Sequence, residues 1–133
     1  MFQFVSDNAP DGVFWLKNDA HFYYVNDQAC KSLGYTREEL MKLSLFDIDP
    51  VFPPEAWNKS WNSFHNKEIE TEQLESFHKR KNGSVFPVEV IAQHYWFHDN
   101  DLHVAFVRDI TQRKKTEENI VQTKIQFQTL IKK

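Results

Sequence analysis

Apolar residues alternate with polar ones, or form short aromatic runs, in five separate segments of the chain. Two segments near the N-terminus, 13–16 and 22–25, are rich in aromatic and β-branched residues and flank a polar turn. Three longer ones follow in the second half, at 69–79, 85–97 and 102–110. Such runs between turn residues predict strands.

Two turns separate the last three strands. Asn82-Gly83 is typical of a two-residue type I′ hairpin. Residues 99–101, with the sequence Asp-Asn-Asp, mark the second turn. If that turn is a two-residue turn directly after His98, Trp96 lies opposite His103 in the register.

Helical signals fill the middle of the chain. Asn26 stands at an N-cap position, so residues 27–33 are expected to form a short helix that ends at Gly34. Thr36 and Glu39 have the spacing of a capping box, which predicts another short helix.

A longer helix is expected after the Phe-Pro-Pro break, with Pro54 in its first turn. One face of this helix is aromatic and carries Trp57, Trp61, Phe64 and His65. Such a stripe is more often core than ligand pocket. From residue 111 the chain is rich in Lys, Glu and Gln without Gly or Pro, which predicts a projecting helix.

The order of elements predicts an α+β fold. The two N-terminal and three C-terminal strands close into one five-stranded antiparallel sheet, short helices cover one face, and a C-terminal helix projects as a linker. We expect a sensory domain over residues 1–112 and a helical linker toward a downstream domain over residues 113–133.

Composition excludes several kinds of partner. The 133 residues are 41% hydrophobic and 26% charged, with a net charge of −3, so neither nucleic acid nor an anionic membrane is an expected partner. Cys30 is the only cysteine, which rules out an intramolecular disulfide and fits a cytoplasmic protein. No apolar run reaches the ~20 residues of a membrane span.

The ordered set of motifs resembles the PAS family, and the resemblance runs from about residue 2 to residue 115. It is carried by Asn26, by Leu33-Gly34-Tyr35-Thr36-Arg37-Glu38-Glu39-Leu40, by Lys81-Asn82-Gly83-Ser84, and by Arg108-Asp109-Ile110-Thr111-Gln112-Arg113-Lys114. The resemblance implies a PAS fold and a sensory module of a longer, bacterial signal-transduction protein. A sensor histidine kinase is the expected parent, with a diguanylate cyclase as the alternative.

Neither enzymatic motifs nor cofactor motifs stand out. The chain has no nucleotide-binding glycine loop and no nucleophile–base constellation, so we expect no catalytic activity. Cys30 lies outside any stretch like that of flavin-binding relatives, and His65 lies away from the position of the family's haem ligand. We therefore expect neither flavin nor haem, and read Cys30 as a small apolar residue.

The histidines of the last hairpin invite a metal hypothesis. In the register above, His94, His98 and His103 share one face around Trp96. With no carboxylate clearly placed beside them, the expectation is no metal, and a solvated sheet face or a dimer contact instead.

Family topology and alternation together name candidate pocket residues, and these are Trp15, Trp61, His78, Val90 and Phe106. A cavity above ~300 Å³ with converging polar groups would favour a ligand-binding module. The absence of such a cavity would favour a ligand-free dimerisation or spacer module.

The end of the chain carries the candidate relay. Asp109 and Thr111 are expected to fix the last strand against the outgoing helix, with Arg113 pairing with Asp109. Within that helix, Ile120, Phe127 and Ile131 have the spacing of a sparse coiled-coil seam, so a homodimer is expected.

Overall fold

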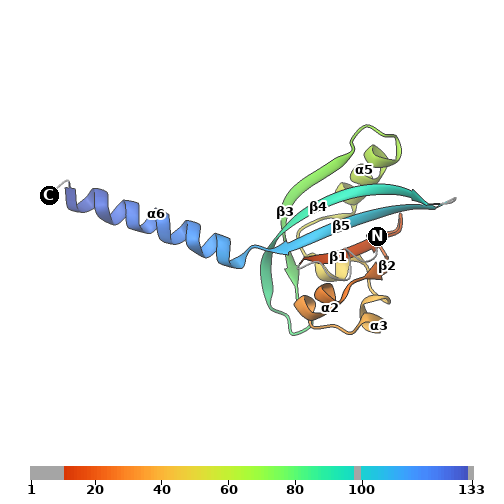
Figure 1. Cartoon of the computed structure of the whole chain (residues 1–133), viewed down its shortest axis with the longest axis horizontal. Helices are drawn as coiled ribbons and strands as arrows, with labels where there is room; N and C mark the ends of the chain where they lie inside the picture. The colour runs from red at the N-terminus through yellow and green to blue at the C-terminus, as the bar shows by residue number, and fades with distance from the viewer. Residues whose placement is uncertain (1–10, 98–99, 132–133) are drawn as a thin grey trace.

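One antiparallel sheet of five strands forms the frame of the protein in the computed structural model, which describes residues 11–97 and 100–131. The strand order in space is β2-β1-β5-β4-β3. The strands are β1 (Gly12–Leu16), β2 (Phe22–Val25), β3 (Thr71–Lys79), β4 (Val85–Phe97) and β5 (Asn100–Asp109) (Figure 1). The last strand is therefore central, between the N-terminal hairpin and β4.

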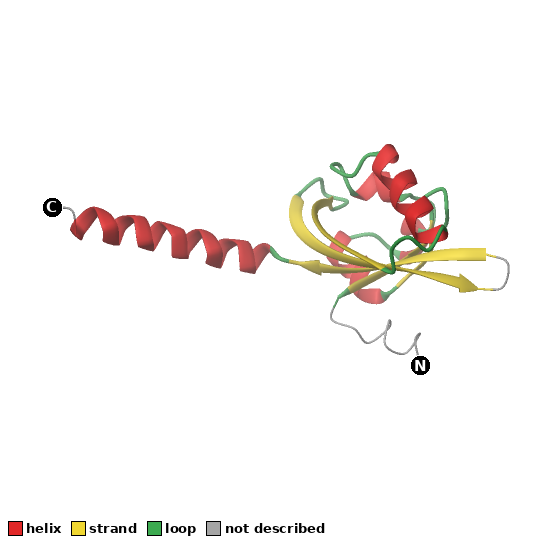
Figure 2. Ribbon diagram, turned by 90° about the horizontal axis from the view of Figure 1, so that it is seen from above, coloured by secondary structure: helices red, strands yellow, loops and turns green. Residues whose placement is uncertain are grey.

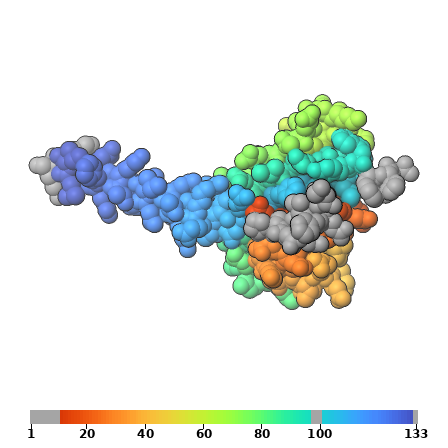
Figure 3. Space-filling view, in the orientation of Figure 1, coloured from red at the N-terminus to blue at the C-terminus, as the bar shows by residue number. Residues whose placement is uncertain are grey.

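Four helices connect β2 to β3 and lie on one face of the sheet (Figure 2). They are α2 (Asp27–Leu33), α3 (Arg37–Leu40), α4 (Leu45–Ile48) and α5 (Pro54–His65). The helix α6 (Thr111–Ile131) continues from β5 and extends away from the domain (Figure 3). The predicted α+β fold is confirmed, although α4 was not predicted.

Asn26 joins the first helix to the first strand. Its buried Oδ1 accepts hydrogen bonds from the backbone N–H groups of Val13 and Ala29, both at 2.9 Å. Its Nδ2 donates to the Asp11 carbonyl at 3.1 Å. One amide thus caps α2 and also holds β1, which explains why a polar side chain is tolerated in the core.

The core lies between the sheet and the helices. Strand residues that point toward the helices, such as Phe14, Val88 and Ala105, pack against helix residues such as Leu33 and Trp57. Phe64 is completely buried, so two members of the aromatic stripe on α5 belong to the interior. Within the described residues, no helix combines the length and the apolar character needed to cross a bilayer.

The β3–β4 connection is not the two-residue turn that Asn82-Gly83 suggested. The Arg80 amide donates to the Ser84 carbonyl at 2.8 Å, which leaves a loop of three residues. Gly83 alone in this loop has a positive φ, of 91°. The Asn82 side chain instead accepts from the Ser84 amide at 2.9 Å, a local bond that a type I′ turn would not need.

The expected register of the β4–β5 hairpin is also wrong, by two residues. Phe97 pairs with Asn100, so Asp101 belongs to β5 and lies opposite Trp96. His94 consequently lies opposite His103. His98, the third histidine of the expected set, is outside the described residues.

Candidate functional site

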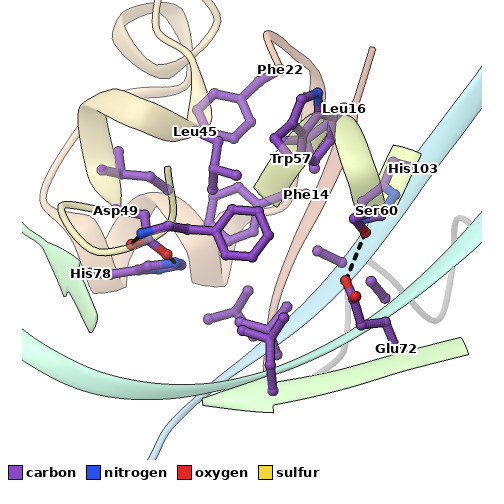
Figure 4. A pocket seen from close by; sticks show the side chains of 17 residues that line it. Phe14, Leu16, Phe22, Leu45, Asp49, Trp57, Ser60, Glu72, His78 and His103 are labelled. Carbon is purple, nitrogen blue, oxygen red and sulfur yellow. Dashed lines mark hydrogen bonds and ion pairs between the residues drawn. The ribbon is translucent and has the colours of Figure 1, made fainter. Parts of the chain in front are cut away.

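A cavity of about 50 Å³ lies between the helices and the concave face of the sheet (Figure 4). Alternate residues of the strands form its floor, among them Phe14, Ala92 and Ala105, and Trp57 of α5 forms part of its cover. Most of its lining is apolar. Five polar side chains reach it, and these are Asp49, Ser60, Glu72, His78 and His103.

At one end of the cavity, both carboxylate oxygens of Asp49 accept hydrogen bonds. Its Oδ1 accepts from the backbone amides of Val51 and Phe52 at 2.8 and 2.9 Å. Its Oδ2 accepts from the Ser76 hydroxyl at 2.8 Å and lies 3.6 Å from His78 Nε2. These bonds keep a carboxylate in the interior, directly beside an imidazole.

Burial dominates the chemistry of His78. Desolvation lowers the pKa of His78 to about 4, although the nearby Asp49 carboxylate acts in the opposite direction. The imidazole is therefore neutral near pH 7. Its ring packs edge-on against Phe14, with ring centres 6.2 Å apart, so it serves as a polar but uncharged part of the wall.

The other end of the cavity is bounded by Ser60 and His103. The Ser60 hydroxyl donates to Glu72 Oε1 at 2.8 Å, linking α5 to β3. His103 is buried with its ring 4.9 Å from that of Trp57 and 5.1 Å from that of Phe64. Burial, with a smaller contribution from His94, lowers the pKa of His103 to about 3.

The structure brings together only some of the candidate pocket residues. His78 and Val90 line the cavity, whereas Trp61 packs against the core without lining it. Trp15 and Phe106 do not line it, because each directly follows a lining residue on its strand and so points to the opposite face. On that face, Trp15 contacts Tyr23 and Tyr24.

Sequence reasoning missed four polar residues at or beside the cavity, and these are Asp49, Ser60, Glu72 and Ser76. Asp49 is followed by Pro50, which looked like a simple break. Glu72 and Ser76 share the parity of His78 on β3. That shared parity was the available signal, since His78 was already placed on the cavity side.

The joint between β5 and α6 is tightly bonded. Asp109 Oδ1 accepts from the Thr111 amide at 2.8 Å and from the Thr111 hydroxyl at 2.5 Å. The expected partner of Arg113 was wrong. Asp109 faces Arg80 at 3.6 Å, whereas Arg113 Nη2 lies 3.0 Å from Glu75 Oε2.

Acidic residues of β3 and β4 form ion pairs with the first turn of α6. Arg113 also reaches Glu89 at 3.4 Å, and Lys114 reaches Glu75 at 2.8 Å. These contacts lower the pKa of the Glu75 carboxyl, with the hydrogen bond from Lys114 as the main cause. The helix is therefore fixed to β3 and β4 as well as to β5.

The rest of α6 has no buried residue. Ile120, Phe127 and Ile131 are each more than half exposed. Figure 3 shows the helix standing clear of the domain surface. Cys30, in contrast, is half-buried on α2 and packs against the core, and burial raises the pKa of its thiol.

Comparisons with known proteins agree with this architecture. A family model described as a PAS domain matches residues 10–112. The chain is 28% identical over 118 residues to a methyl sulfide methyltransferase-associated sensor of Methanosarcina acetivorans. The matched region covers 87% of this chain but only 12% of the sensor. The chain thus spans about an eighth of that relative.

Two solved PAS domains share the fold and about a quarter of the sequence. One, from a two-component sensor histidine kinase, is 26% identical with a TM-score of 0.70, covering 81% of this chain and 95% of that one. The other, from an HTR-like protein of Haloarcula marismortui, is 27% identical with a TM-score of 0.73, covering 82% and 88%.

Proposed function

Because this chain belongs to the PAS domain family of signal-transduction proteins, we propose that it binds a small ligand and relays the signal through α6 to an output domain. PAS domains are generally sensory, non-catalytic modules, and we propose no catalytic activity for this fragment. We propose the cytoplasm as its location and a sensor histidine kinase as its parent, with a diguanylate cyclase as the alternative. The similar PAS domain of a two-component sensor histidine kinase supports that order.

The continuity of β5 with α6 is the observation that carries this proposal. His103, Ala105 and Val107 of β5 line the cavity, and α6 begins at Thr111. Between them, Asp109 bonds to Thr111 and fixes the direction of the helix. A ligand that displaces β5 therefore moves the base of α6 directly.

The size of the cavity limits the ligand. At about 50 Å³ it has room for about four waters, well below the ~300 Å³ of a drug-sized site. The apolar lining with Ser60 and His103 at its rim favours a neutral ligand of a few heavy atoms. Haem and flavin are far larger, so we propose neither as a cofactor.

A ligand-free dimerisation or spacer module is the second candidate function. The small cavity favours it, since aromatic rings such as Phe14, Phe22 and Trp57 already occupy most of the interior. In this case the domain contributes only its shape and its dimer contacts.

Dimerisation through α6 belongs to both candidates. Ile120, Phe127 and Ile131 lie within one narrow stripe of the helix and are exposed. Since a seam with three apolar positions is sparse, we propose a weak parallel homodimer. A helix pair near balance responds to a small input, which suits a relay.

Thermal unfolding with short-chain alcohols and amides as probes tests ligand binding. We expect a probe that fits to raise Tm, since binding at 100 times Kd adds about 2.7 kcal/mol. Ala92→Leu fills the cavity and should abolish the rise. Gln93→Leu adds the same side chain on the opposite face of β4 and should keep it. If no probe stabilises the parent chain, or if Ala92→Leu responds like the parent, the ligand-free module is the correct reading.

A further inference from the structure

Three side chains able to bind a metal ion meet where the end of α5 contacts the β4–β5 hairpin. His65 is the last residue of α5, His94 lies on β4, and Asp101 lies on β5. Asp101 Oδ2 is 2.5 Å from His65 Nδ1 and 2.9 Å from His94 Nε2, and the three ligand atoms lie within 4.8 Å of one another. We propose that these residues bind a divalent transition-metal ion, with zinc as the expected ion.

The donor set suits zinc. Two imidazole nitrogens and one carboxylate oxygen are ligands that zinc accepts at roughly 2.0–2.2 Å, so that tetrahedral neighbours lie roughly 3.3 Å apart. The two contacts of Asp101 must therefore open by less than about 1 Å, and the two imidazole nitrogens, which lie within 4.8 Å of each other, must approach by up to about 1.5 Å. His65 ends its helix and its side chain is 58% exposed, so it can make this movement and leave the fourth position to water.

The other two ligands are already in place. The side chain of His94 is 1% exposed, and its ring lies 4.7 Å from that of Trp61 and 5.8 Å from that of Phe64. The side chain of Asp101 is 16% exposed and already lies in hydrogen-bonding distance of His94 Nε2. An imidazole and a carboxylate that are already held in place reduce the entropic cost of binding.

One feature limits the affinity. His94 Nδ1 is buried and has no hydrogen-bond partner within the described part of the chain. Metal-binding histidines usually donate this second N–H, and losing that contact weakens binding about 10–100-fold. We therefore expect a dissociation constant in the micromolar rather than the nanomolar range.

The site would connect two elements that otherwise meet through apolar contacts. α5 contributes Trp57 and Ser60 to the cavity lining, and His94 and Asp101 belong to the hairpin. A bound ion would restrain α5 over the cavity from the end opposite the α6 joint. The ion would bind whether or not the cavity holds a ligand and α6 relays a signal.

Titration calorimetry of the 133-residue chain, purified without a polyhistidine tag, tests the site. We expect one Zn²⁺ to bind per chain and to raise Tm, and we expect Mg²⁺ to do neither. Absorption in the visible region on adding Co²⁺ gives a direct view of its coordination. A parent chain without saturable Zn²⁺ binding would overturn the proposal.

Matched variants identify the ligands. His65→Ala, at an exposed helix end, and Asp101→Asn, which keeps the side-chain size, should each weaken binding at least about 10-fold. His21→Ala removes an exposed histidine that lies 3.3 Å from Asp19 and should leave binding unchanged. Unchanged affinity in both folded ligand variants would show that Asp101 only forms hydrogen bonds with His65 and His94.

Discussion

Two buried histidines should make the domain sensitive to mild acid. Burial lowers the pKa of His78 to about 4 and that of His103 to about 3. In the unfolded chain both imidazoles titrate near pH 6.5. As the pH falls below 6.5, the two histidines therefore become protonated in the unfolded chain but stay neutral in the folded chain, and the folded state loses stability.

The magnitude follows from the size of the shifts. Each histidine removes about 1.4 kcal/mol per pH unit between its unfolded and folded pKa values. Between pH 6.5 and pH 5 this is about 2 kcal/mol for each residue and about 4 kcal/mol for both. Small domains have roughly 5–15 kcal/mol of stability, so the loss is large.

Carboxylates do not interfere in this window. The pKa values of Glu39, Glu75 and Asp101 are also lowered by their partners, and stability linked to them is lost as the pH falls. That loss begins only near their unfolded pKa values of about 4. Measurements above pH 5 therefore isolate the histidines.

Urea denaturation at several values between pH 7 and pH 5 measures the effect. His103→Leu should keep most of the stability at pH 7 and halve the loss on going to pH 5, because only one histidine of the pair, His78, then remains. His21→Ala, at an exposed site, should show the full loss. If the parent loses less than about 1 kcal/mol, or if His103→Leu shows the parent's pH dependence, the histidines do not control acid stability.

Three other predictions concern the helices. Asn26→Ala should lower the free energy of unfolding, measured by chemical denaturation, by about 2–4 kcal/mol, because it removes the cap of α2 and leaves the buried Val13 amide without its acceptor. The exposed cap variant Thr36→Ala should lower it by only about 1 kcal/mol. Equal losses would contradict the double role of Asn26. Asp109→Ala should leave the domain folded but speed amide exchange in the first turn of α6, and unchanged exchange would remove Asp109 from the joint. Ile120→Asp, and truncation after Lys115, should both reduce dimerisation in sedimentation experiments; two variants as dimeric as the parent would place the interface elsewhere.

Local signals predicted the elements well because they are encoded within a few residues. The Asn26 cap, the Thr36–Glu39 capping box and the strand β4 all lie where the sequence placed them. Asn82-Gly83 gave the wrong turn type, because turn propensities do not take into account the hydrogen bond that the Asn82 side chain accepts from the Ser84 amide.

Side-chain partners were harder to predict because they depend on register. A two-residue shift in one hairpin moved Asp101 from a turn onto β5, between His65 and His94. The same limit explains Trp15 and Phe106, which are one position away from lining residues and so lie on the other face. Arg113 pairs with Glu75 across the sheet, a contact that no local pattern encodes.

The position of β1 beside β5 also determines how the domain bears force. Gly12, at the start of β1, pairs with Val107, close to the end of β5, so the chain enters and leaves the sheet at the same end of two neighbouring strands. Tension between the two ends would therefore peel these strands apart one hydrogen bond at a time rather than shear all of them together. We expect the domain to open at low pulling force, beginning at the strand pair that leads into α6.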